Sequence, residues 1–412
     1  MITVGEASAR ILARIEPLSG EAVATGNTAG RVLSERVVAP LTSPPWDNSS
    51  MDGYAVNSGD LSAGVTLRVV ETIHAGSFPS RSLERGEAMR IMTGAPLPQG
   101  ADSVIRHEDT DDGREVVAVR ELRDAGRNIR KAGEDFRKGD VLFERGELVG
   151  VPHIGVLASA GIKTVSVHRR PRIAIISSGD ELVELDDFQP DVAGSRIVSS
   201  NSLTLPASVR DAGGDPRALG IASDSPVSLK QKFESARGSD LIITSAGISV
   251  GDHDHVRTAI TDLDGSIDFW KVRMRPGAPL AFGSIDGVPW IGLSGNPVSA
   301  IVTFELFVRP VIRRMLGMRK LFRATIPVRT RQPITLAASL MHFLRVVITP
   351  GPDGHHDAEL AGSQSSAVLT VLARANALLI LPGDRLDIAA GELHRALPLG
   401  AGFEESESLQ LA

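Results

Sequence analysis

The stretch Arg172-Ile173-Ala174-Ile175-Ile176 (172–176) is a short apolar run directly after Arg169-Arg170-Pro171, and it opens the part of the chain that decides the fold. A short apolar run of this kind, bounded by turn residues, is typical of a strand buried on both faces. Similar runs follow, with helical patterns between them. The predicted strands cover 172–176, 196–199, 240–244 and 267–272, and the predicted helices cover 202–212, 228–237 and 254–263. Strands that alternate with helices predict a central α/β/α domain with a mostly parallel sheet over 172–318.

Two local signals complete this domain. Asp286-Gly287 lies within 280–292, and this pair between apolar runs predicts a hairpin. Asn296 precedes Pro297, which favours the start of a long helix, because Asn caps helices and Pro suits the first helical position.

The remaining segments predict smaller units. Residues 4–37 place apolar side chains at near-helical spacing, which predicts helix. Short β-type runs between Gly, Pro and Asp predict a β-rich domain over 41–135. Residues 323–412 return to short β runs, which predict a small β-barrel or sandwich. The expected fold class is therefore multidomain, α/β plus β.

Composition excludes several classes of protein. The chain has 412 residues, a net charge of −6 and no cysteine, so disulfides and thiolate chemistry are excluded. It has no basic arm for nucleic acid and no apolar run near the ~20 residues that span a membrane. The N-terminus lacks the apolar core of a signal peptide, so we expect a cytoplasmic protein.

Four loops follow the predicted strands or hairpin of the α/β domain. They cover Ser177–Glu181, Ser199–Ser202, Ser245–Asp254 and Ser294–Pro297, and they are rich in Gly and hydroxyl groups. In a parallel α/β sheet, ligands bind at the carboxyl ends of the strands, and exposed N–H groups there attract phosphate. The four loops together predict a phosphate-binding edge; ordinary capping and turn chemistry is the alternative for each loop alone.

Charged side chains lie in or beside these loops. Asp180, Glu181, Asp252 and Asp254 are candidate carboxylates for Mg²⁺ and bound phosphates, or else simple partners of helix N-termini. In the run 271–277, alternate positions carry Lys271, Arg273 and Arg275, which places three cations on one face of a strand. These cations suit an oxyanion, with a solvated strand edge as the alternative.

Two turns of the β-rich region are also candidates. The stretch 44–56 combines Trp46, Asp52 and the chain's single tyrosine, Tyr54, and such a mixture suits recognition of a flat polar ligand. The stretch 92–98 is a rigid turn with Thr93 beside Gly94. Two purely structural turns are the alternative.

Other motifs point to no chemistry. A P-loop is absent, and Gly247–Gly251 meets the Gly-x-Ser-x-Gly pattern without the sharp turn of a serine hydrolase. His253 and His255 do not share a helix face, so no zinc site is predicted.

Several of these stretches match one known family in order. PPWDNSSMDGYAV, IMTGAPLPQGADSVIRHED, SSGDEL, SAGISVGDHD, FWKVRMRPGAPLAFG and GLSGNPVSA resemble the motifs of molybdopterin molybdenumtransferases, to which the C-terminal part of gephyrin is similar. The resemblance covers essentially the whole chain. It implies an extended linking region (1–40 and 136–171), a β-rich insertion (41–135), a molybdopterin-binding α/β domain (172–318) and a C-terminal β-barrel (323–412).

The resemblance also implies a reaction and an assembly. Molybdate is inserted into adenylylated molybdopterin, AMP is released, and Mg²⁺ assists. The expected assembly is an elongated homodimer, whose site lies between the α/β domain of one subunit and the β-rich insertion of the other. Other enzymes of molybdenum cofactor biosynthesis are candidate partners.

Site residues follow by position. The resemblance implies catalytic roles for Asp52, Thr93, Glu181, Asp224, Lys271 and Arg275. Together with the loops above, it implies molybdopterin contacts at Ser178, Gly179, Asp180, Ser249, Gly251, Asp254, Ser294, Gly295, Asn296, Pro297 and Ser366. The expected Mg²⁺ ligands are Asp52, Glu181 and Asp254.

Three positions depart from the family pattern. Ala246 replaces a usual Gly, Ser294 a usual Pro, and Ala278 a usual Lys. Ala246 adds a methyl group where a ligand approaches, and Ala278 removes a cation. The three departures together favour a second hypothesis, a non-catalytic molybdopterin-binding carrier, sensor or scaffold. The site carboxylates, which are all present, favour the enzyme.

Overall fold

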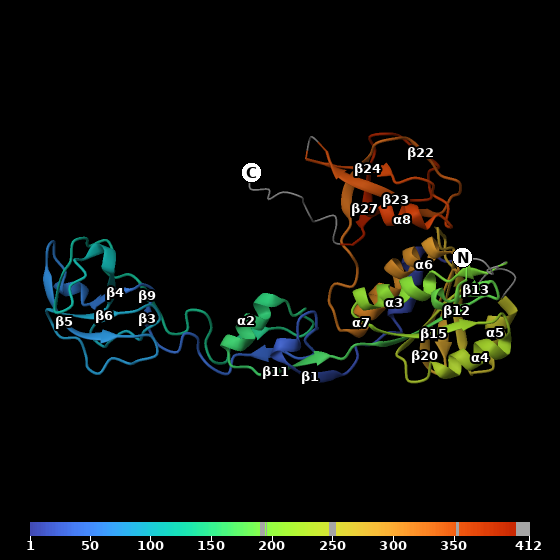
Figure 1. Cartoon of the computed structure of the whole chain (residues 1–412). Helices are drawn as coiled ribbons and strands as arrows, with labels where there is room; N and C mark the ends of the chain where they lie inside the picture. The colour runs from blue at the N-terminus through green and yellow to red at the C-terminus, as the bar shows by residue number, and fades with distance from the viewer. Residues whose placement is uncertain (190–193, 195, 247–252, 352–353, 401–412) are drawn as a thin grey trace.

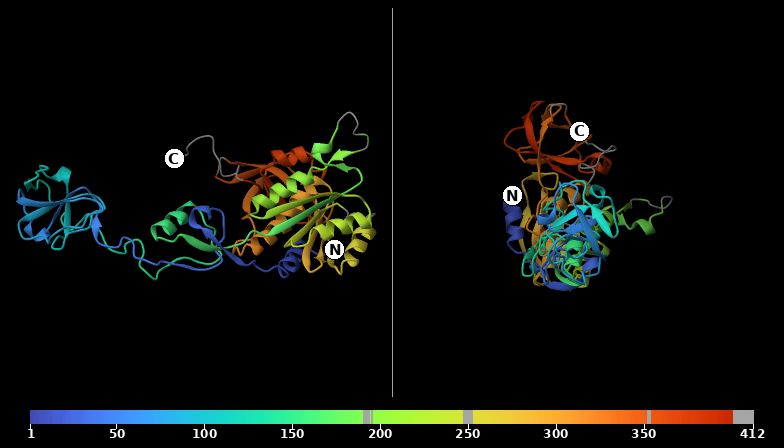
Figure 2. Two further views of the ribbon diagram at one scale, coloured as in Figure 1. Left: turned by 60° about the horizontal axis from the view of Figure 1, so that its bottom comes forward. Right: turned by 90° about the vertical axis from the view of Figure 1, so that its left-hand side faces the viewer.

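The computed structural model describes residues 1–189, 194, 196–246, 253–351 and 354–400. The chain is elongated, with a β-rich domain at one end and the α/β domain and a C-terminal barrel at the other (Figures 1 and 2). A slender linking region, through which the chain passes twice, connects the two ends. The multidomain α/β plus β fold class is confirmed.

The α/β domain is built on a six-stranded, mostly parallel sheet. Its order is β15 (Asp215–Ala222), β12 (Arg172–Ser178), β16 (Leu241–Ser245), β20 (Val288–Leu293), β19 (Pro279–Ile285) and β17 (Ser266–Lys271). The first four strands are parallel, and β19 is antiparallel to both of its neighbours.

Both faces of this sheet are covered, which explains the apolar run at 172–176. Ile173 and Ile175 pack in one core with the helices α3, α6 and α7, whereas Ala174 and Ile176 pack on the opposite face with α4 and α5. Because successive side chains of a strand point to opposite faces, a strand between two layers is apolar throughout. The helices are α3 (Asn201–Asp211), α4 (Pro226–Ser235), α5 (His253–Thr261), α6 (Pro297–Thr303) and α7 (Arg309–Met315).

The hairpin and the helix start follow the local signals. Asp286 and Gly287 both have positive φ angles, 49° and 76°, as a tight two-residue hairpin turn requires. Pro297 is the first residue of α6, with Asn296 at the N-cap position, although its side chain makes no cap hydrogen bond. A five-residue π-helical segment, Phe304–Val308, joins α6 to α7.

Two expectations for this domain are wrong. The segment predicted as a strand of the main sheet at 196–199 forms β14 (Ile197–Val198), which pairs only with β13 (Leu182–Val183) in a small arm beside the sheet. The edge strand is instead β15, which was not predicted because it contains Pro216 and Gly220. Proline is tolerated at a sheet edge, where an N–H group need not pair.

The linking region is mainly extended. Helix α1 ends at Leu12, so the predicted helix over 4–37 is wrong beyond that point. Pro17 interrupts the pattern, and pairing between distant segments, invisible to local spacing, takes over. The strands pair as β1 (Gly20–Ala24) with β11 (Thr164–His168) and β2 (Val37–Val38) with β10 (Val141–Phe143), beside α2 (Val151–Ser159).

The β-rich domain holds a five-stranded sheet with an apolar cluster on each face. Its order is β7 (Ser103–Arg106), β4 (Gly53–Val56), β6 (Glu87–Ile91), β5 (Thr66–Ile73) and β8 (Val116–Ala118), and the pair β3 (Asn48–Ser49) and β9 (Ile129–Arg130) lies beside it. Gly53 must be glycine, because a Cβ atom there would lie 2.0 Å from the carbonyl oxygen of Ile105. That close pairing holds Asp52 at the start of β4.

The C-terminal region is a closed barrel. The strands β23 (Met341–Pro350), β24 (His356–Leu360), β21 (Ile326–Thr330), β27 (Leu393–Pro398) and β25 (Ala377–Leu381) pair in that order, and β25 returns to pair with β23. The short strand β18 (Met274–Arg275) joins β23, and Phe343, Leu378 and Leu397 pack into the core of the α/β domain. The barrel is thus fixed against the sheet domain. In the described part of the chain, every helix is too short or too polar to cross a bilayer.

Gly283 offers a test of the central sheet. A Cβ atom at this position would lie 2.0 Å from the carbonyl oxygen of Ser266, so Gly283→Ala must push β17 away from β19. We expect a loss of about 3 kcal/mol of unfolding free energy in denaturant titrations. Gly155→Ala is the matched control, because a Cβ atom there meets nothing and Ala favours the helix α2 by about 1 kcal/mol. Equal effects of the two substitutions would contradict this account.

Candidate functional site

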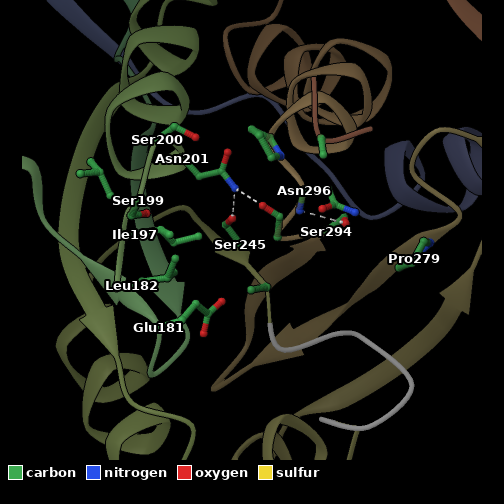
Figure 3. A pocket seen from close by; sticks show the side chains of 15 residues that line it. Glu181, Leu182, Ile197, Ser199, Ser200, Asn201, Ser245, Pro279, Ser294 and Asn296 are labelled. Atoms are coloured by element: carbon green, nitrogen blue, oxygen red, sulfur yellow. Dashed lines mark hydrogen bonds between the residues drawn. The ribbon is translucent and has the colours of Figure 1, made fainter. Parts of the chain in front are cut away.

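A cavity of about 570 Å³ opens at the carboxyl ends of β12, β16 and β20. Its lining includes residues from all four predicted ligand loops, namely Glu181, 199–201, 245–246 and 294–297 (Figure 3). The structure therefore brings these loops together at one edge of the sheet, three of them after the parallel strands β12, β16 and β20 and the loop at 199–202 after β14. A cavity of this size suits a small organic ligand.

The side-chain amide of Asn201 connects three of the loops. Its Nδ2 atom donates to the hydroxyl of Ser245 at 2.6 Å and to the carbonyl oxygen of Gly295 at 2.9 Å. Asn201 and Ser245 are buried, so these bonds are shielded from water and stiffen the cavity wall. The loop of Asn201 was predicted to bind a ligand, but Asn201 itself was not among the predicted site residues. The feature of the sequence that could have identified it is an amide side chain in the first turn of a helix that follows a strand.

Carboxylates and a glycine form one side of the cavity mouth. The side chain of Glu181 lines the cavity, and a Cβ atom on Gly179 would lie 2.6 Å from its carboxylate, so that glycine makes room for it. Asp180 and Asp224 each accept a hydrogen bond from the other's backbone N–H, at 3.1 and 3.4 Å. Ser178 is buried at the end of β12, and its hydroxyl has no partner among the described residues.

The cationic edge follows the predicted alternation. Arg273 and Arg275 are exposed and Lys271 is half-buried, whereas Val272 and Met274 between them are buried. Lys271 ends β17 at the same edge of the sheet but does not line the cavity.

A second cavity of about 280 Å³ adjoins the first, sharing Ser294 and Asn296 with it. Arg275, Ala278 and Ser366 also line it. Asn296 donates from Nδ2 to the hydroxyl of Ser366 at 3.3 Å, which joins the α/β domain to the barrel. The predicted tail residue Ser366 therefore does reach the cavity region.

Arg345 lies beyond this second cavity and was missed by sequence analysis. It lines a third cavity, of about 500 Å³, together with Arg275 and Ser366, yet it is only 1% exposed. Its Nη2 atom donates to the carbonyl oxygens of Ser363 and Ser365, and its Nε atom has no partner among the described residues. Burial lowers the pKa of Arg345, which marks a cation poorly compensated by the protein. An arginine inside the apolar run 343–348 was the signal that could have found it.

Asp52 and Thr93 meet in the β-rich domain. A carboxylate oxygen of Asp52 accepts from the backbone N–H of Thr93 at 2.7 Å and from its hydroxyl at 2.8 Å. These two bonds, with smaller contributions from His107 and Arg90, hold the pKa of Asp52 below its usual value. Within one chain, this pair lies at the opposite end of the molecule from the α/β cavity (Figure 1).

Tyr54 lies in the apolar core of the β-rich domain. Its ring is fully buried, and its hydroxyl donates to the carbonyl oxygen of Gly113 at 2.9 Å. Burial and the nearby Asp112 raise the pKa of Tyr54 to about 12. The aromatic group that the stretch 44–56 leaves exposed is Trp46.

Four predicted site residues are not placed by side chain. Ser249, Gly251 and Asp252 lie outside the described residues. Asp254 falls in the first turn of α5, where the structure describes the backbone alone.

The carboxylates of the described residues suit Mg²⁺ only in combination with phosphates of a bound substrate. No group of three or more acidic or histidine side chains within the described residues is arranged to hold a metal, and Asp52 and Glu181 lie in different domains. Glu181, with the nearby Asp180 and Asp224, supplies carboxylates that suit Mg²⁺ when substrate phosphates complete the coordination.

Ala246 lines the first cavity and has a backbone conformation that is unfavourable for a residue with a side chain. It has a φ of +77°, in the left-handed region, and a methyl group built on Gly295 would lie 3.0 Å from its Cβ atom. A side chain in this conformation costs about 1–2 kcal/mol.

Replacing Ala246 by Gly should therefore relieve strain. We expect Ala246→Gly to raise the unfolding free energy by up to about 1 kcal/mol, after the greater flexibility of unfolded Gly is subtracted. Ala174→Gly, in a regular buried strand, is the control and should lower it by about 1 kcal/mol. Chemical denaturation measures both; two equal losses would show that Ala246 is unstrained.

The bonds to Asp52 predict a titration change. Thr93→Val keeps the backbone N–H but removes the hydroxyl donor, so the pKa of Asp52 should rise towards its ordinary value of 3.8. Since the folded pKa is lowered, the stabilisation by this carboxylate is present above its ordinary pKa and is lost as pH falls through the folded value. Carboxyl NMR titration measures the midpoint, with Thr72→Val as control; an unchanged or lower midpoint for Thr93→Val argues against this assignment.

Comparisons with known proteins agree along the chain. Residues 2–161 match the MoeA N-terminal region (domain I and II), residues 174–314 match a probable molybdopterin binding domain, and residues 327–399 match the MoeA C-terminal region (domain IV). The molybdopterin molybdenumtransferase of Nostoc sp. is 36% identical over 88% of this chain and 85% of its own.

Two further relatives cover nearly the full length. The molybdopterin molybdenumtransferase of Haemophilus influenzae is 33% identical over 95% of this chain and 97% of its own. The crystal structure of the molybdopterin biosynthesis protein MoeA from Pyrococcus horikoshii superposes with a TM-score of 0.81 at 28% identity, covering 97% of this chain and 99% of that one. The chain therefore belongs to the molybdopterin molybdenumtransferase family of enzymes.

Proposed function

We propose that this protein inserts molybdenum from molybdate into adenylylated molybdopterin, forming molybdenum cofactor and releasing AMP with the help of Mg²⁺. The observation that carries the proposal is the convergence of four donor-rich loops at one cavity, continuous with a second cavity that leads to Arg345. The substrates of this reaction are anions, and the chain offers neutral donors at one end of this path and cations at the other.

The first cavity suits the nucleotide and the pterin phosphate. Its lining supplies the hydroxyl groups of Ser199, Ser200 and Ser294 and the helix start at Pro297. Backbone N–H groups and hydroxyls at helix N-termini bind phosphate. Bound Mg²⁺ would neutralise charge at the phosphoanhydride, and Glu181 is the residue of the described lining that would hold it.

The cations suit molybdate. Arg275 and Arg345 line the same cavity from two domains, and the free Nε of Arg345 lacks a protein partner among the described residues. A dianion between them would compensate a buried charge that the protein leaves uncompensated. We assign this cavity to molybdate on its way to the pterin.

Asp52 and Thr93 would complete the site in a homodimer. The bonds from Thr93 hold the pKa of Asp52 below its ordinary value of 3.8, so Asp52 is a carboxylate at neutral pH and can accept a hydrogen bond from a water or hydroxyl near the anhydride. Since the same chain keeps this pair away from the cavity, we infer that it serves the partner's cavity, in the cytoplasm.

A carrier, sensor or scaffold without turnover is the second candidate. It is favoured by Ser294, Ala278 and Ala246, all of which line the first two cavities. Ala278 in particular leaves the second cavity with one cation fewer than the family pattern. Other enzymes of cofactor biosynthesis remain proposed partners under either function.

Turnover tests the proposal. Purified protein with adenylylated molybdopterin, Mg²⁺ and molybdate should release AMP in proportion to the cofactor formed. Asp52→Ala and Glu181→Ala should each slow release by roughly 100-fold, whereas Asp262→Ala, an exposed carboxylate at the end of α5, should not. Tight binding of molybdopterin without AMP release would favour the carrier.

Mixing the two inactive variants tests the shared site. If each site combines Asp52 of one subunit with Glu181 of the other, half of the randomly mixed dimers regain one intact site. We expect recovery of about a quarter of the wild-type rate. No recovery, with exchange of subunits verified by mass, would place both residues in one chain's site.

A further inference from the structure

Two exposed aromatic rings lie together on the β-rich domain. Trp46 is 38% exposed and Phe78 is 63% exposed, and their ring centroids are 4.7 Å apart with an interplanar angle of 65°. Among the large exposed side chains of the described residues, three are aromatic: Trp46, Phe78 and Phe322. Two of these three therefore contact each other at one place.

Trp46 is held firmly by its neighbours. The carboxylate of Asp47 accepts from Lys131 Nζ at 2.9 Å and from the backbone N–H of Ala132 at 2.8 Å. The carbonyl oxygen of Asp47 accepts from the backbone N–H of Leu97 at 2.8 Å. The backbone that presents the indole is thus bound on both sides, and the edge contact of Phe78 limits the motion of the ring.

Trp46 belongs to the same segment of backbone as Asp52. Residues 46–52 run beside 92–98, joined by the bridge from Asn48 to Pro96 and by the bonds from Thr93 to Asp52. The segment that carries Asp52 therefore also carries an exposed indole.

In the part of the chain that the structure describes, the first two cavities of the α/β domain lack the aromatic side chains that Trp46 and Phe78 supply in the β-rich domain. No aromatic side chain lines the first or second cavity among the described residues; their walls are aliphatic, proline and polar side chains, with Glu181 in the first and Arg275 in the second. The proposed substrate contains two flat heterocycles, adenine and pterin, whose faces stack well on aromatic rings.

We propose that Trp46, supported edge-on by Phe78, stacks on the adenine ring of the nucleotide bound in the partner subunit's cavity. This inference rests on the proposed function, because it requires the β-rich domain of one protomer to close the cavity of the other. Trp46 is then a binding residue that supplies the π-surface which the cavity itself does not have.

Nucleotide binding by the full-length dimer tests this. AMP is the probe, and calorimetry should show roughly tenfold weaker binding to Trp46→Leu, which keeps bulk but loses the ring. Trp46→Phe should restore binding to within a few-fold of wild type. Phe322→Leu is the matched control at an exposed aromatic residue of the linker to the barrel and should bind AMP normally. In turnover, Trp46→Leu should raise KM more than it lowers kcat.

Each outcome separates this inference from the proposed function. Equal AMP binding by wild type and Trp46→Leu overturns the stacking, even if both turn over. Trp46-dependent AMP binding without AMP release from the substrate supports stacking and removes the transferase function. Dissociation of Trp46→Leu into monomers, seen by light scattering, would assign the indole to subunit contact and overturn the proposal.

Discussion

The central sheet is buried on both faces, and this constraint governs where chemistry can occur. β12 alternates Ile173 and Ile175 towards one helical layer with Ala174 and Ile176 towards the other, so neither face has room for a polar site. Polar groups are left only where the strands end. The cavity therefore lies at the strand ends, because helices cover both faces of the sheet. Hydrogen bonds from Asn201 to two neighbouring loops connect the walls of this cavity.

The chain separates its charges over a long distance. Neutral donors and Glu181 gather at the sheet edge, cations lie between the sheet and the barrel, and the ionised Asp52 lies in a domain at the far end. Within one chain, the domain of Asp52 lies far from the sheet edge (Figure 1). In the homodimer proposed above, the elongated linking region would act as a spacer between two surfaces that serve one site in different subunits.

Local signals predicted much of the α/β domain and its loops. The turn at Asp286-Gly287 and the helix start at Pro297 were found because each depends on its own backbone conformation. The cations at 271, 273 and 275 do alternate with buried residues, but the expected single strand is wrong, because β17 ends at Lys271 and β18 begins at Met274. Three of the four loops could be placed at one edge because β12, β16 and β20 are parallel, whereas the loop at 199–202 follows β14 outside the main sheet.

The features that sequence patterns did not predict depend on contacts between segments far apart in the chain. The edge position that allows Pro216 in β15, and the pairing of β1 with β11 that ends the expected helix, are set by segments far along the chain. In the sequence, Arg345 is a single charged residue within an apolar run. Only the folded barrel shows that it lines the same cavity as Arg275. Tyr54 was expected near a ligand, but its hydroxyl serves the turn at Gly113.

The contact between Ala246 and Gly295 has a consequence for how this pocket can change. The two positions face each other from adjacent strand ends, and a methyl on the second would crowd the methyl of the first at 3.0 Å. Only one of them can carry a side chain without moving a backbone. Position 295 therefore has to stay glycine wherever position 246 carries a side chain, as it does here, whereas a glycine at 246 would remove the crowding.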